Sequence, residues 1–553
     1  MRKNNSSLKW IISVSGKSII FVILLSVLGA LMSYLSVRFA VVSKSVIDIA
    51  TGVSEGKLSD ALFALTAFIA MQILIHIIYT VSEVRVSCKL TNTIQRQTFS
   101  RLIKRDYMSV GKYHSGELVN RLSTDSLAVS GGVMSIVPVA ATLLSKAYFG
   151  FCELFRLDYQ LALICLIAFP IVTLAARIYG KKMKLLRKKC LESDGTIKSF
   201  LQDSVQNILA VKAFVKEELC TVRLEDMQSK NYRLKVKQGV ISMLANLLFF
   251  AIMTFAYYFA LMWCAAKIHS GVMTVGTLTA ILQLIGIMQD PFQSFSSVIS
   301  GYYTTTASAE RLIELELLKE DKSEYFDISQ TNFEKLKFND VTFSYDDEKV
   351  LSSINTTLSA GEIAAVSGES GIGKSTFMKL AMGVLAPVSG SVDIICDGKK
   401  ISPARSRNLF SYVPQGNMIL AGTILENITF FDQNADLEKA KQSASLAMLG
   451  EYIEALPDGY NTFIGEGGIG LSEGQIQRIA IARALYADRP ILLLDEATSS
   501  LDEATEKSII TNIKSLKGIT GIIITHRPCA KHIADYELIF DKTGTSVSKK
   551  CQN

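Results

Sequence analysis

Charged residues are scarce in this sequence, and its cysteines follow no recognisable framework. Only 20% of the 553 residues are charged, whereas 49% are hydrophobic, and a soluble protein of this size rarely has so apolar a composition. The nine cysteines are scattered from Cys88 to Cys551 with no C-x-x-C pair. Their odd number and irregular spacing argue against a disulfide framework and give no metal-binding pattern.

The positive net charge does not indicate a nucleic-acid-binding protein. The formal charge is +7 at pH 7, but the basic residues flank hydrophobic segments, as Arg2, Lys3 and Lys9 do at the amino terminus and a cluster over 181–189 does further on. Basic residues in such positions orient a membrane protein and contact anionic lipid. We therefore expect membrane lipid, and no nucleic acid, among the partners of this chain.

Hydrophobic residues are concentrated before about residue 300, in runs long enough to cross a bilayer, which takes about 20 residues. Only the short segment 156–158 separates the third run from the fourth, which predicts a tight hairpin. The connections between the second and third runs and between the fourth and fifth are long, charged and helical in pattern. We predict an all-α transmembrane domain over residues 1–320 with six spans, at about 18–42, 60–82, 132–154, 159–179, 240–266 and 274–297.

Charge predicts the orientation of these spans. Basic clusters precede the first span, occupy both long connections and follow the sixth span, whereas the opposite connections offer only Lys44, Lys57, Arg156 and Lys267. By the positive-inside rule, both termini and both long connections are cytoplasmic. A location in a bacterial plasma membrane is implied by the family resemblance described below.

Four polar residues inside the spans have two interpretations. In the first interpretation, these residues line a substrate cavity. A charge at mid-bilayer costs about 2.5–3.5 kcal/mol, so Lys146 is not expected to face lipid. Alternatively, they lie near an interface or bond to a neighbouring helix. The sequence leaves both interpretations open for Gln72, His76, Lys146 and Gln283.

After about residue 325 the pattern changes to short β-rich runs alternating with helical stretches, which predicts an α/β domain over residues 330–553. Between the strand-like IAAVS and the helix-like TFMKLAMGVL lies a match to G-x-x-x-x-G-K-[ST], a phosphate-binding loop or P-loop. Its glycines let backbone N–H groups surround phosphate oxygens at the positive end of a helix dipole. The predicted ATP-binding residues are Gly368, Glu369, Ser370, Gly371, Ile372, Gly373, Lys374, Ser375 and Thr376.

Several residues are predicted to act around this loop. Lys374 supplies a point charge for the β- and γ-phosphates, and Ser375 offers its hydroxyl to Mg²⁺. The apolar strand ILLLDE delivers Asp495 to the metal and places Glu496 to polarise a water for attack on the γ-phosphate. His526 follows the apolar run GIIIT, at a strand end from which an imidazole reaches a γ-phosphate.

One further segment, Leu471 to Gln475, resembles the LSGGQ signature motif. Together with the P-loop and ILLLDE, this segment makes the chain resemble the ATP-binding cassette (ABC) superfamily. The resemblance extends over nearly the whole chain and points to type I exporter half-transporters. It implies that the helix capped by Ser472 faces the γ-phosphate of ATP held by a second subunit, so that two chains enclose two nucleotides. A second half-transporter, identical or different, is therefore an expected partner, and the signature residues are Leu471, Ser472, Glu473, Gly474 and Gln475.

The resemblance implies roles for further residues. Tyr345 matches the aromatic that stacks on adenine, and Gln415 matches the glutamine that contacts Mg²⁺ and the attacking water. Thr462 to Gly468, with Glu466, resembles an exporter-specific loop. Residues 500–502 correspond to the loop that crosses to the partner subunit, and His526 falls at the switch histidine.

Three segments before residue 320 resemble the regions that join the two domains. Residues 115–118, with Arg121, Leu122 and Asp125, resemble the first cytoplasmic coupling region, and residues 208–214 with Glu217 resemble the second. Residues 307–312, ASAERL, resemble the helix that leads into the nucleotide-binding domain.

One signature residue departs from the family pattern. Glu473 stands where the signature has glycine, and a carboxylate near a triphosphate repels it unless the side chain points away. Because Lys374, Asp495, Glu496 and His526 are all present, we expect the chain's own half-site to hydrolyse ATP.

The resemblance predicts an exporter ATPase with Mg-ATP as its fuel and an amphipathic drug, lipid or peptide as its substrate. No peptidase-like segment precedes the first span, which disfavours a transporter that cleaves leader peptides. Two alternatives stay open: a nucleotide-gated channel or regulator, which has no need of Glu496, and an importer built on the same fold, which shares every motif.

Overall fold

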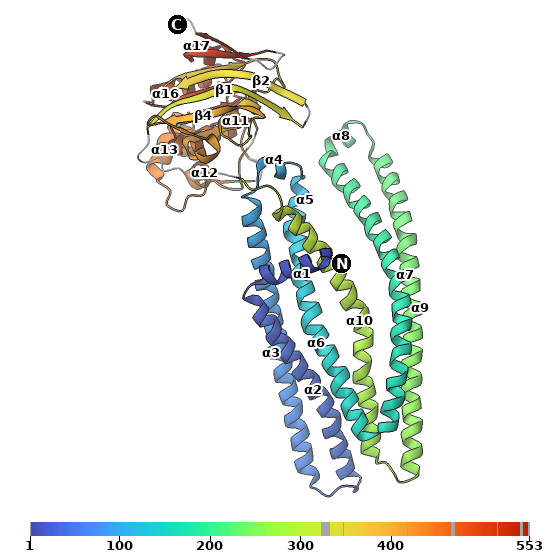
Figure 1. The fold of residues 1–553 in the computed structure, drawn as a ribbon. Helices are drawn as coiled ribbons and strands as arrows, with labels where there is room; N and C mark the ends of the chain where they lie inside the picture. Colours follow the sequence, from blue (N-terminus) through green and yellow to red (C-terminus); the bar gives the residue numbers. More distant parts are fainter. Residues whose placement is uncertain are drawn as a thin grey trace. The chain divides into compact units, whose positions relative to one another are not determined.

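The computed structural model describes residues 2–321, 332–346, 348–416, 418–465, 470–516, 518–541 and 546–550 (Figure 1). The chain forms two compact units. The first, Met1–Ile103 with His114–Leu317, is helical, and the second, Lys104–Tyr113 with Leu318–Asn553, contains the sheets. The predicted fold class, a helical membrane part followed by an α/β part, is confirmed.

Each of the predicted spans lies within one long helix, except that Thr274 is the N-cap of α10. The helices continue far beyond the spans, since the 53 residues of α9 extend for about 80 Å at 1.5 Å per residue, against about 30 Å for a bilayer core. The helical elements of the first unit are α1 (Arg2–Ser15), α2 (Ser18–Ala50), α3 (Leu58–Leu102), α5 (Ser115–Asn120), the π-helix η1 (Arg121–Asp125), α6 (Ser126–Leu157), α7 (Tyr159–Gln206), α8 (Ile208–Ala213), α9 (Glu217–His269) and α10 (Val275–Glu316).

Among the described residues, four helical segments combine the length and the apolar composition that a membrane crossing needs. They are Ser18–Ala50, Leu58–Leu102, Ser115–Leu157 and Glu217–His269, and Val275–Gln289 is a shorter apolar segment.

Small residues set the packing between these helices. A Cβ atom on Gly132 of α6 would lie 1.6 Å from Thr305 Oγ1 of α10, and one on Gly29 of α2 would lie 2.2 Å from Thr142 Oγ1 of α6. Ser33 donates a hydrogen bond across the same α2–α6 contact to the carbonyl oxygen of Thr142 at 2.9 Å. Small residues at such positions let helix backbones approach closely in a membrane, where burial from water contributes no driving force.

A buried carboxylate closes the hairpin between α6 and α7. Asp158 is the only residue between the two helices, and its side chain accepts hydrogen bonds from the first amides of α7, Gln160 N at 3.0 Å and Leu161 N at 3.1 Å. Lys267 Nζ, near the end of α9, lies 2.6 Å from the other carboxylate oxygen, and Trp263 Nε1 donates to it at 3.1 Å. The hairpin is thereby tied to α9.

The second unit is built on two larger sheets and a small one, with strand orders β2-β1-β4-β5, β12-β11-β3-β10-β9-β6 and β7-β8. All residues of β3, β9 and β10 are buried, as expected for parallel strands covered on both faces. The strands are β1 (Phe333–Tyr345), β2 (Glu348–Ser359), β3 (Ile363–Ser367), β4 (Ser389–Cys396), β5 (Lys399–Ile401), β6 (Phe410–Val413), β7 (Gly422–Thr423), β8 (Phe463–Ile464), β9 (Ile491–Asp495), β10 (Thr520–Ile524), β11 (Tyr536–Phe540) and β12 (Ser546–Lys550).

Helices flank the sheets of this unit (Figure 1). Two of them bear on the predicted site directly, because α11 follows the P-loop and α15 follows Ser472. The helices are α4 (Tyr107–Val110), α11 (Lys374–Ala381), α12 (Ile424–Thr429), α13 (Leu437–Leu446), α14 (Gly450–Glu454), α15 (Glu473–Tyr486), α16 (Glu503–Ser515) and α17 (Pro528–Ile533).

The unit boundary differs from the predicted one, because residues 104–113 belong with the sheets. Asp106 N donates to Lys319 O at 2.9 Å, and Asp321 N donates to Lys104 O at 3.0 Å, so this segment pairs with the chain that follows α10. Arg407 of the α/β fold forms a bidentate ion pair with Asp321. Long-range pairing of this kind has no local sequence pattern, so the sequence alone does not predict that residues 104–113 belong to this unit.

The predicted joining segments lie in the helical unit. Residues 115–118 fall in α5, followed by η1, where Arg121 pairs with Glu117 and Glu314. Asp125 accepts hydrogen bonds from Ser308 and Arg311 of the ASAERL segment in α10. Residues 208–213 form α8, and Glu217 begins α9.

Candidate nucleotide site

Three parallel strands bring the predicted residues to one edge of the six-stranded sheet. Strand β10 lies between β3 and β9, with Ile524 paired to Val366 on one side and to Asp495 on the other. The P-loop follows β3, Glu496 follows Asp495 at the end of β9, and His526 comes shortly after β10. Carboxyl ends of neighbouring parallel strands form the usual ligand site of such sheets.

The P-loop has the backbone conformation that its glycines permit. Gly368, Gly371 and Gly373 have φ angles of 146°, 82° and 102°, which L side chains rarely adopt. A Cβ atom on Gly373 would also lie 2.8 Å from the side chain of Val350. Gly373 is the N-cap of α11, so the free amides of the first helical turn adjoin the loop. This arrangement suits an anion such as a phosphate.

Lys374 projects into this loop and is held by its backbone. Its Nζ atom donates to Gly368 O at 2.7 Å and to Glu369 O at 3.1 Å, and it lies 3.2 Å from His526 Nε2. Burial lowers the pKa of Lys374, while the negative charges of Glu496 and Asp495 act in the opposite direction. Phosphate oxygens are stronger acceptors than these carbonyls, so the ammonium is placed to exchange one for the other.

Asp495 is buried between two hydroxyl groups. Only 2% of its surface is exposed. Ser375 Oγ donates to its Oδ1 atom at 3.1 Å, and Tyr412 OH donates to its Oδ2 atom at 3.2 Å. Burial raises the pKa of Asp495, and burial together with the Asp495 charge raises that of Tyr412. A carboxylate and a hydroxyl in contact are oxygen donors of the kind that Mg²⁺ prefers, so these residues fit that ion.

Glu496 lies at the centre of a second group of side chains. Gln415 Nε2 donates to its Oε2 atom at 2.8 Å, and His526 Nε2 lies 3.5 Å from its Oε1 atom. The backbone of Glu496 has φ of 50°, and its amide donates to Ile524 O at 3.1 Å. A positive φ at a non-glycine residue costs about 1–3 kcal/mol and is common at active sites. Glu496 is therefore held by its surroundings in a strained conformation.

Tyr345 lies at the end of β1 and adjoins the helix after the P-loop. Its hydroxyl is 3.4 Å from Thr376 Oγ1, and its ring makes an edge-on contact with Phe343 at 4.9 Å between centroids. The ring therefore lies beside the helix that follows the P-loop, and its adenine-stacking role stays a prediction.

The signature segment begins α15 with a capping box. Ser472 Oγ accepts from Gln475 N at 3.3 Å, and Gln475 Oε1 accepts from Ser472 N at 2.7 Å. Glu473 is the first helical residue and is exposed. Within the described residues, no hydrogen bond joins this segment to the P-loop. Within the segment that resembles the exporter-specific loop, Phe463 and Ile464 form β8, whereas Glu466 lies outside the described residues.

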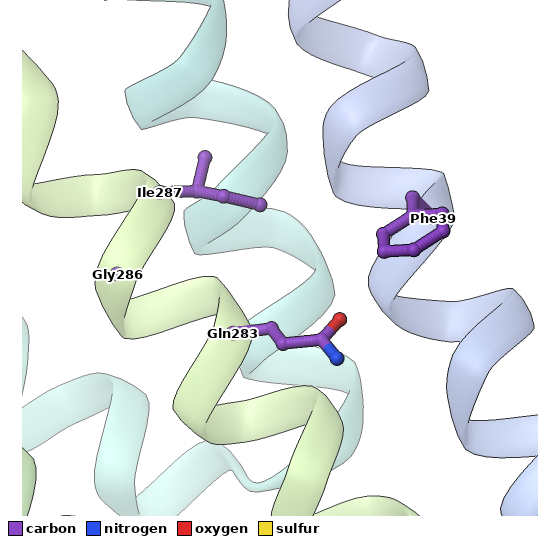
Figure 2. A pocket seen from close by; sticks show the side chains of 4 residues that line it. All are labelled: Phe39, Gln283, Gly286 and Ile287. Atoms are coloured by element: carbon purple, nitrogen blue, oxygen red, sulfur yellow. The ribbon is translucent and has the colours of Figure 1, made fainter. Parts of the chain in front are cut away.

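The helical unit contains a hollow of about 360 Å³ lined by Phe39 of α2 and by Gln283, Gly286 and Ile287 of α10. Figure 2 shows the Gln283 amide extending from α10 toward the helix that carries Phe39. Of the polar candidates in the spans, Gln283 thus borders a hollow, while His76 of α3 is exposed on its helix. One amide among apolar groups suits an amphipathic molecule.

Sequence reasoning missed Tyr412. Tyr412 lies in β6, three residues before Gln415, and the pairing of β6 with β9 places Tyr412 opposite Leu493. An aromatic residue in a short strand is ordinarily a packing residue, and only the strand order shows that this hydroxyl reaches Asp495. The missing signal was the neighbour relation between two strands about 80 residues apart.

Replacing Tyr412 with Phe is expected to raise the Mg²⁺ concentration needed for half-maximal ATP hydrolysis about tenfold. The change keeps the ring but removes a hydrogen bond to a charged carboxylate, an interaction of about 1.5–3 kcal/mol. A magnesium titration of the ATPase at fixed ATP measures the effect. Tyr452→Phe, which removes a hydroxyl elsewhere in the same unit, is the control. An unaltered magnesium requirement in Tyr412→Phe would show that the hydroxyl does not orient Asp495.

Comparison with known protein families gives two matches along the chain. Residues 19–292 match the model described as "ABC transporter transmembrane region", and residues 351–499 match the model described as "ABC transporter". The matches follow one another in the order of the helical and α/β units.

Curated relatives are similar over most of their length. An ATP-dependent lipid A-core flippase of Desulfotalea psychrophila is 30% identical over 456 residues, which cover 81% of this chain and 79% of that protein. A putative export ATP-binding/permease protein of Rickettsia felis is 30% identical over 478 residues, covering 83% and 81%. The ATP-dependent lipid A-core flippase of Escherichia coli K12 is 28% identical over 479 residues, covering 85% and 81%.

A solved structure has the same fold. It is described as a bacterial Atm1-family ABC exporter with ATP bound, and it is similar with a TM-score of 0.79 over 98% of this chain and 96% of that one. The sequence identity is 23%, so the likeness concerns the fold.

Proposed function

Because the chain belongs to the ABC transporter family, we propose that it is a half-exporter that hydrolyses ATP to move an amphipathic substrate out of the cytoplasm. The observation that carries the proposal is the convergence of Lys374, Asp495, Glu496 and His526 at the ends of β3, β9 and β10. A transport ATPase needs these groups at one triphosphate, and the α/β unit is linked to helices that are long enough to span a membrane.

Each group at the site has a role in hydrolysis. The P-loop amides and Lys374 bind the β- and γ-phosphates, and Glu496 orients a water and accepts its proton as the water attacks the γ-phosphorus. Gln415, which donates to Glu496 at 2.8 Å, holds that carboxylate toward the water. His526 contacts the γ-phosphate from the side of Lys374. The leaving group is ADP, and its charge is stabilised by the fixed donors of the loop.

Ser375, Asp495 and Gln415 would hold the Mg²⁺ ion that accompanies ATP. When bound, the ion neutralises charge on the phosphate oxygens. The contact of 3.1 Å between Ser375 and Asp495 supports this assignment. Gln415, whose Nε2 atom donates to Glu496, would offer its amide oxygen to the ion.

The proposal includes a second chain, since within the described residues no hydrogen bond joins the signature segment to the P-loop of the same chain. The capping box leaves Ser472 at the start of α15, where further amides point outward. Such a helix start binds the γ-phosphate of a nucleotide held by a partner subunit, identical or related. Glu473 is exposed at this surface, so its side chain has room to turn away from the phosphate.

A lipid or lipid-like substrate is the form of the proposal that we favour. Curated relatives include ATP-dependent lipid A-core flippases, and the hollow beside Phe39 and Gln283 combines apolar walls with one amide. The proposal includes a bacterial plasma membrane with both termini in the cytoplasm. The basic clusters that flank the spans support this orientation, and bacterial relatives support this membrane.

Replacing Tyr345 with Ala is expected to weaken nucleotide affinity about 5- to 150-fold while leaving turnover at saturating ATP nearly unchanged. Stacking of a base on an aromatic ring contributes about 1–3 kcal/mol, and the ring is remote from the bond that breaks. Titration with a fluorescent ATP analogue and steady-state kinetics measure the two effects. Tyr345→Phe, which retains the stacking surface, should behave as the wild type. Reduced turnover with normal affinity in Tyr345→Ala would contradict the stacking role.

Transport in proteoliposomes tests the function as a whole. Protein with its α/β unit outward, supplied with Mg-ATP outside, should move a fluorescent phospholipid analogue from the outer to the inner leaflet, and Glu496→Gln should abolish the movement. Movement in the opposite direction would indicate an importer. Passive ion flux upon ATP binding, equal in wild type and Glu496→Gln, would indicate a nucleotide-gated channel.

A further inference from the structure

The loop that follows the catalytic strand is fixed by side chains from several elements. This loop, residues 498–502 (the 498–502 loop), lies between β9 and α16. From α15, Gln477 Nε2 donates to Ser499 Oγ at 3.0 Å and to Ser500 Oγ at 3.2 Å, and Ser500 N donates back to Gln477 Oε1 at 3.1 Å. At its far end, Asp502 caps α16 by accepting from Thr505 N at 2.9 Å. The loop is therefore tied to the signature helix α15.

Arg527, the residue after His526, binds the backbone of the same loop. Its Nη1 atom donates to Leu501 O at 2.5 Å, and its Nη2 atom donates to Ser499 O at 2.8 Å. The amide of Arg527 donates to Thr525 Oγ1 at 3.0 Å, which fixes the turn after β10. Because a guanidinium is a rigid planar fork, the two carbonyls are held at a set distance from each other and from the turn that carries His526.

A fully buried carboxylate holds the arginine in place. Glu506 of α16 has 0% exposure; its Oε2 atom lies 3.3 Å from Arg527 Nη1, and its Oε1 atom accepts from Thr498 Oγ1 at 2.7 Å. A charge buried to this extent persists only when it is paired and hydrogen-bonded. Arg527, Glu506 and Gln477 lie outside the predicted nucleotide ligands, so phosphate binding does not account for this network.

We propose that Arg527 is a positioning residue that couples the phosphate contact made by His526 to the geometry of the 498–502 loop. The inference rests on the proposed function and on the resemblance by which residues 500–502 correspond to the loop that crosses to the partner subunit. His526 Nε2 lies 3.2 Å from Lys374 Nζ and 3.5 Å from Glu496 Oε1, so phosphate entry or departure bears on the turn that carries it. Arg527 moves with that turn, and the carbonyls of Ser499 and Leu501 follow.

The Gln477 contacts extend this path to α15. A shift of the 498–502 loop reaches the helix whose first residues form the signature, through three hydrogen bonds of 3.0–3.2 Å. The hydrolytic state of one site is thereby linked to both surfaces that the chain offers to the partner's nucleotide, the 498–502 loop and the start of α15.

The test is Arg527→Lys in the full-length protein, because lysine retains the charge opposite Glu506 but not the fork. We expect kcat for ATP to fall about tenfold, as for loss of one strong hydrogen bond, with KM within about twofold of the wild type. Hydrogen exchange should speed up about tenfold at the amides of the 498–502 loop, while Mg-ATP still protects the P-loop amides of 368–376. Glu506→Gln, a second variant of the same network, should lower kcat without raising KM.

Arg489→Lys is the matched control, since Arg489 precedes β9 and its side chain makes no hydrogen bond to the described residues. It should leave kcat, KM and exchange unchanged. The inference would be overturned if Arg527→Lys had a normal kcat and normal hydrogen exchange in the 498–502 loop. It would also be overturned if the KM of this variant rose while Mg-ATP no longer protected the P-loop amides. A wild-type protein whose P-loop is not protected by Mg-ATP would contradict the proposed function instead.

Discussion

Replacing Glu496 with Gln is expected to leave Mg-ATP binding intact and to lower ATP turnover at least about 10²-fold, the usual scale for loss of a general base. The amide retains the size of the side chain and an oxygen that accepts from Gln415, which donates to Glu496 at 2.8 Å. It cannot accept a proton from the attacking water. Phosphate release under saturating ATP and titration with a fluorescent nucleotide measure the two quantities.

Glu503→Gln provides a control for this variant, because Glu503 begins α16 at an exposed position in the same region. Its turnover should match the wild type. Turnover in Glu496→Gln within about twofold of the wild type would remove the general-base assignment. Loss of nucleotide binding in this variant would show instead that Glu496 has a structural role, for which its positive φ of 50° gives a reason.

The strand, loop and helix that carry the proposed nucleotide-binding residues were predictable because their signals are local. The spacing of Gly368, Gly373 and Lys374 fixes a strand, a turn and a helix within about 20 residues, and the structure has β3, the loop and α11 in that order. Asp495 and Glu496 were predictable for the same reason, since an apolar strand ending in two carboxylates has few other uses after a P-loop.

The residues that the sequence did not predict make contacts between distant segments. Tyr412 reaches Asp495 only because β6 pairs with β9, and Arg527 reaches Leu501 only because β10 pairs with β9 on the other side. From the sequence alone, Tyr412 would be interpreted as an aromatic residue packed in the core and Arg527 as an arginine exposed to solvent. Their roles depend on strand order, which no local pattern states.

The assignment of residues 104–113 to the sheet-containing unit has the same cause. Residues 104–106 pair with 319–321, more than 200 positions later, and Met108 packs against the core formed by β1, β4 and α11. The helical pattern of the connection between the second and third spans is real, because α4 and α5 lie within that connection. Periodicity shows that a segment is helical, but not which unit it packs against.

Replacing Lys374 with Met is expected to lower the affinity for Mg-ATP by about 10- to 100-fold, and with it the turnover at ordinary ATP concentrations. A hydrogen bond from a charged group contributes about 1.5–3 kcal/mol, and Lys374 Nζ has no substitute among the donors described at this loop. Methionine has nearly the same length and fills irregular space well, so the buried position retains its packing while losing the charge.

The distinction between this variant and Glu496→Gln follows from where each charge lies. In the proposed mechanism Lys374, whose Nζ atom donates to Gly368 O and Glu369 O of the P-loop, binds the phosphates, so its loss weakens the ground state and the transition state together. In the proposed mechanism Glu496, which accepts from Gln415, faces the attacking water, so its loss affects the transition state alone. Calorimetric titration should show weakened binding in Lys374→Met and normal binding in Glu496→Gln.

Lys400→Met, at a side chain 69% exposed, controls for loss of a lysine, and wild-type affinity in Lys374→Met would contradict phosphate binding at this loop.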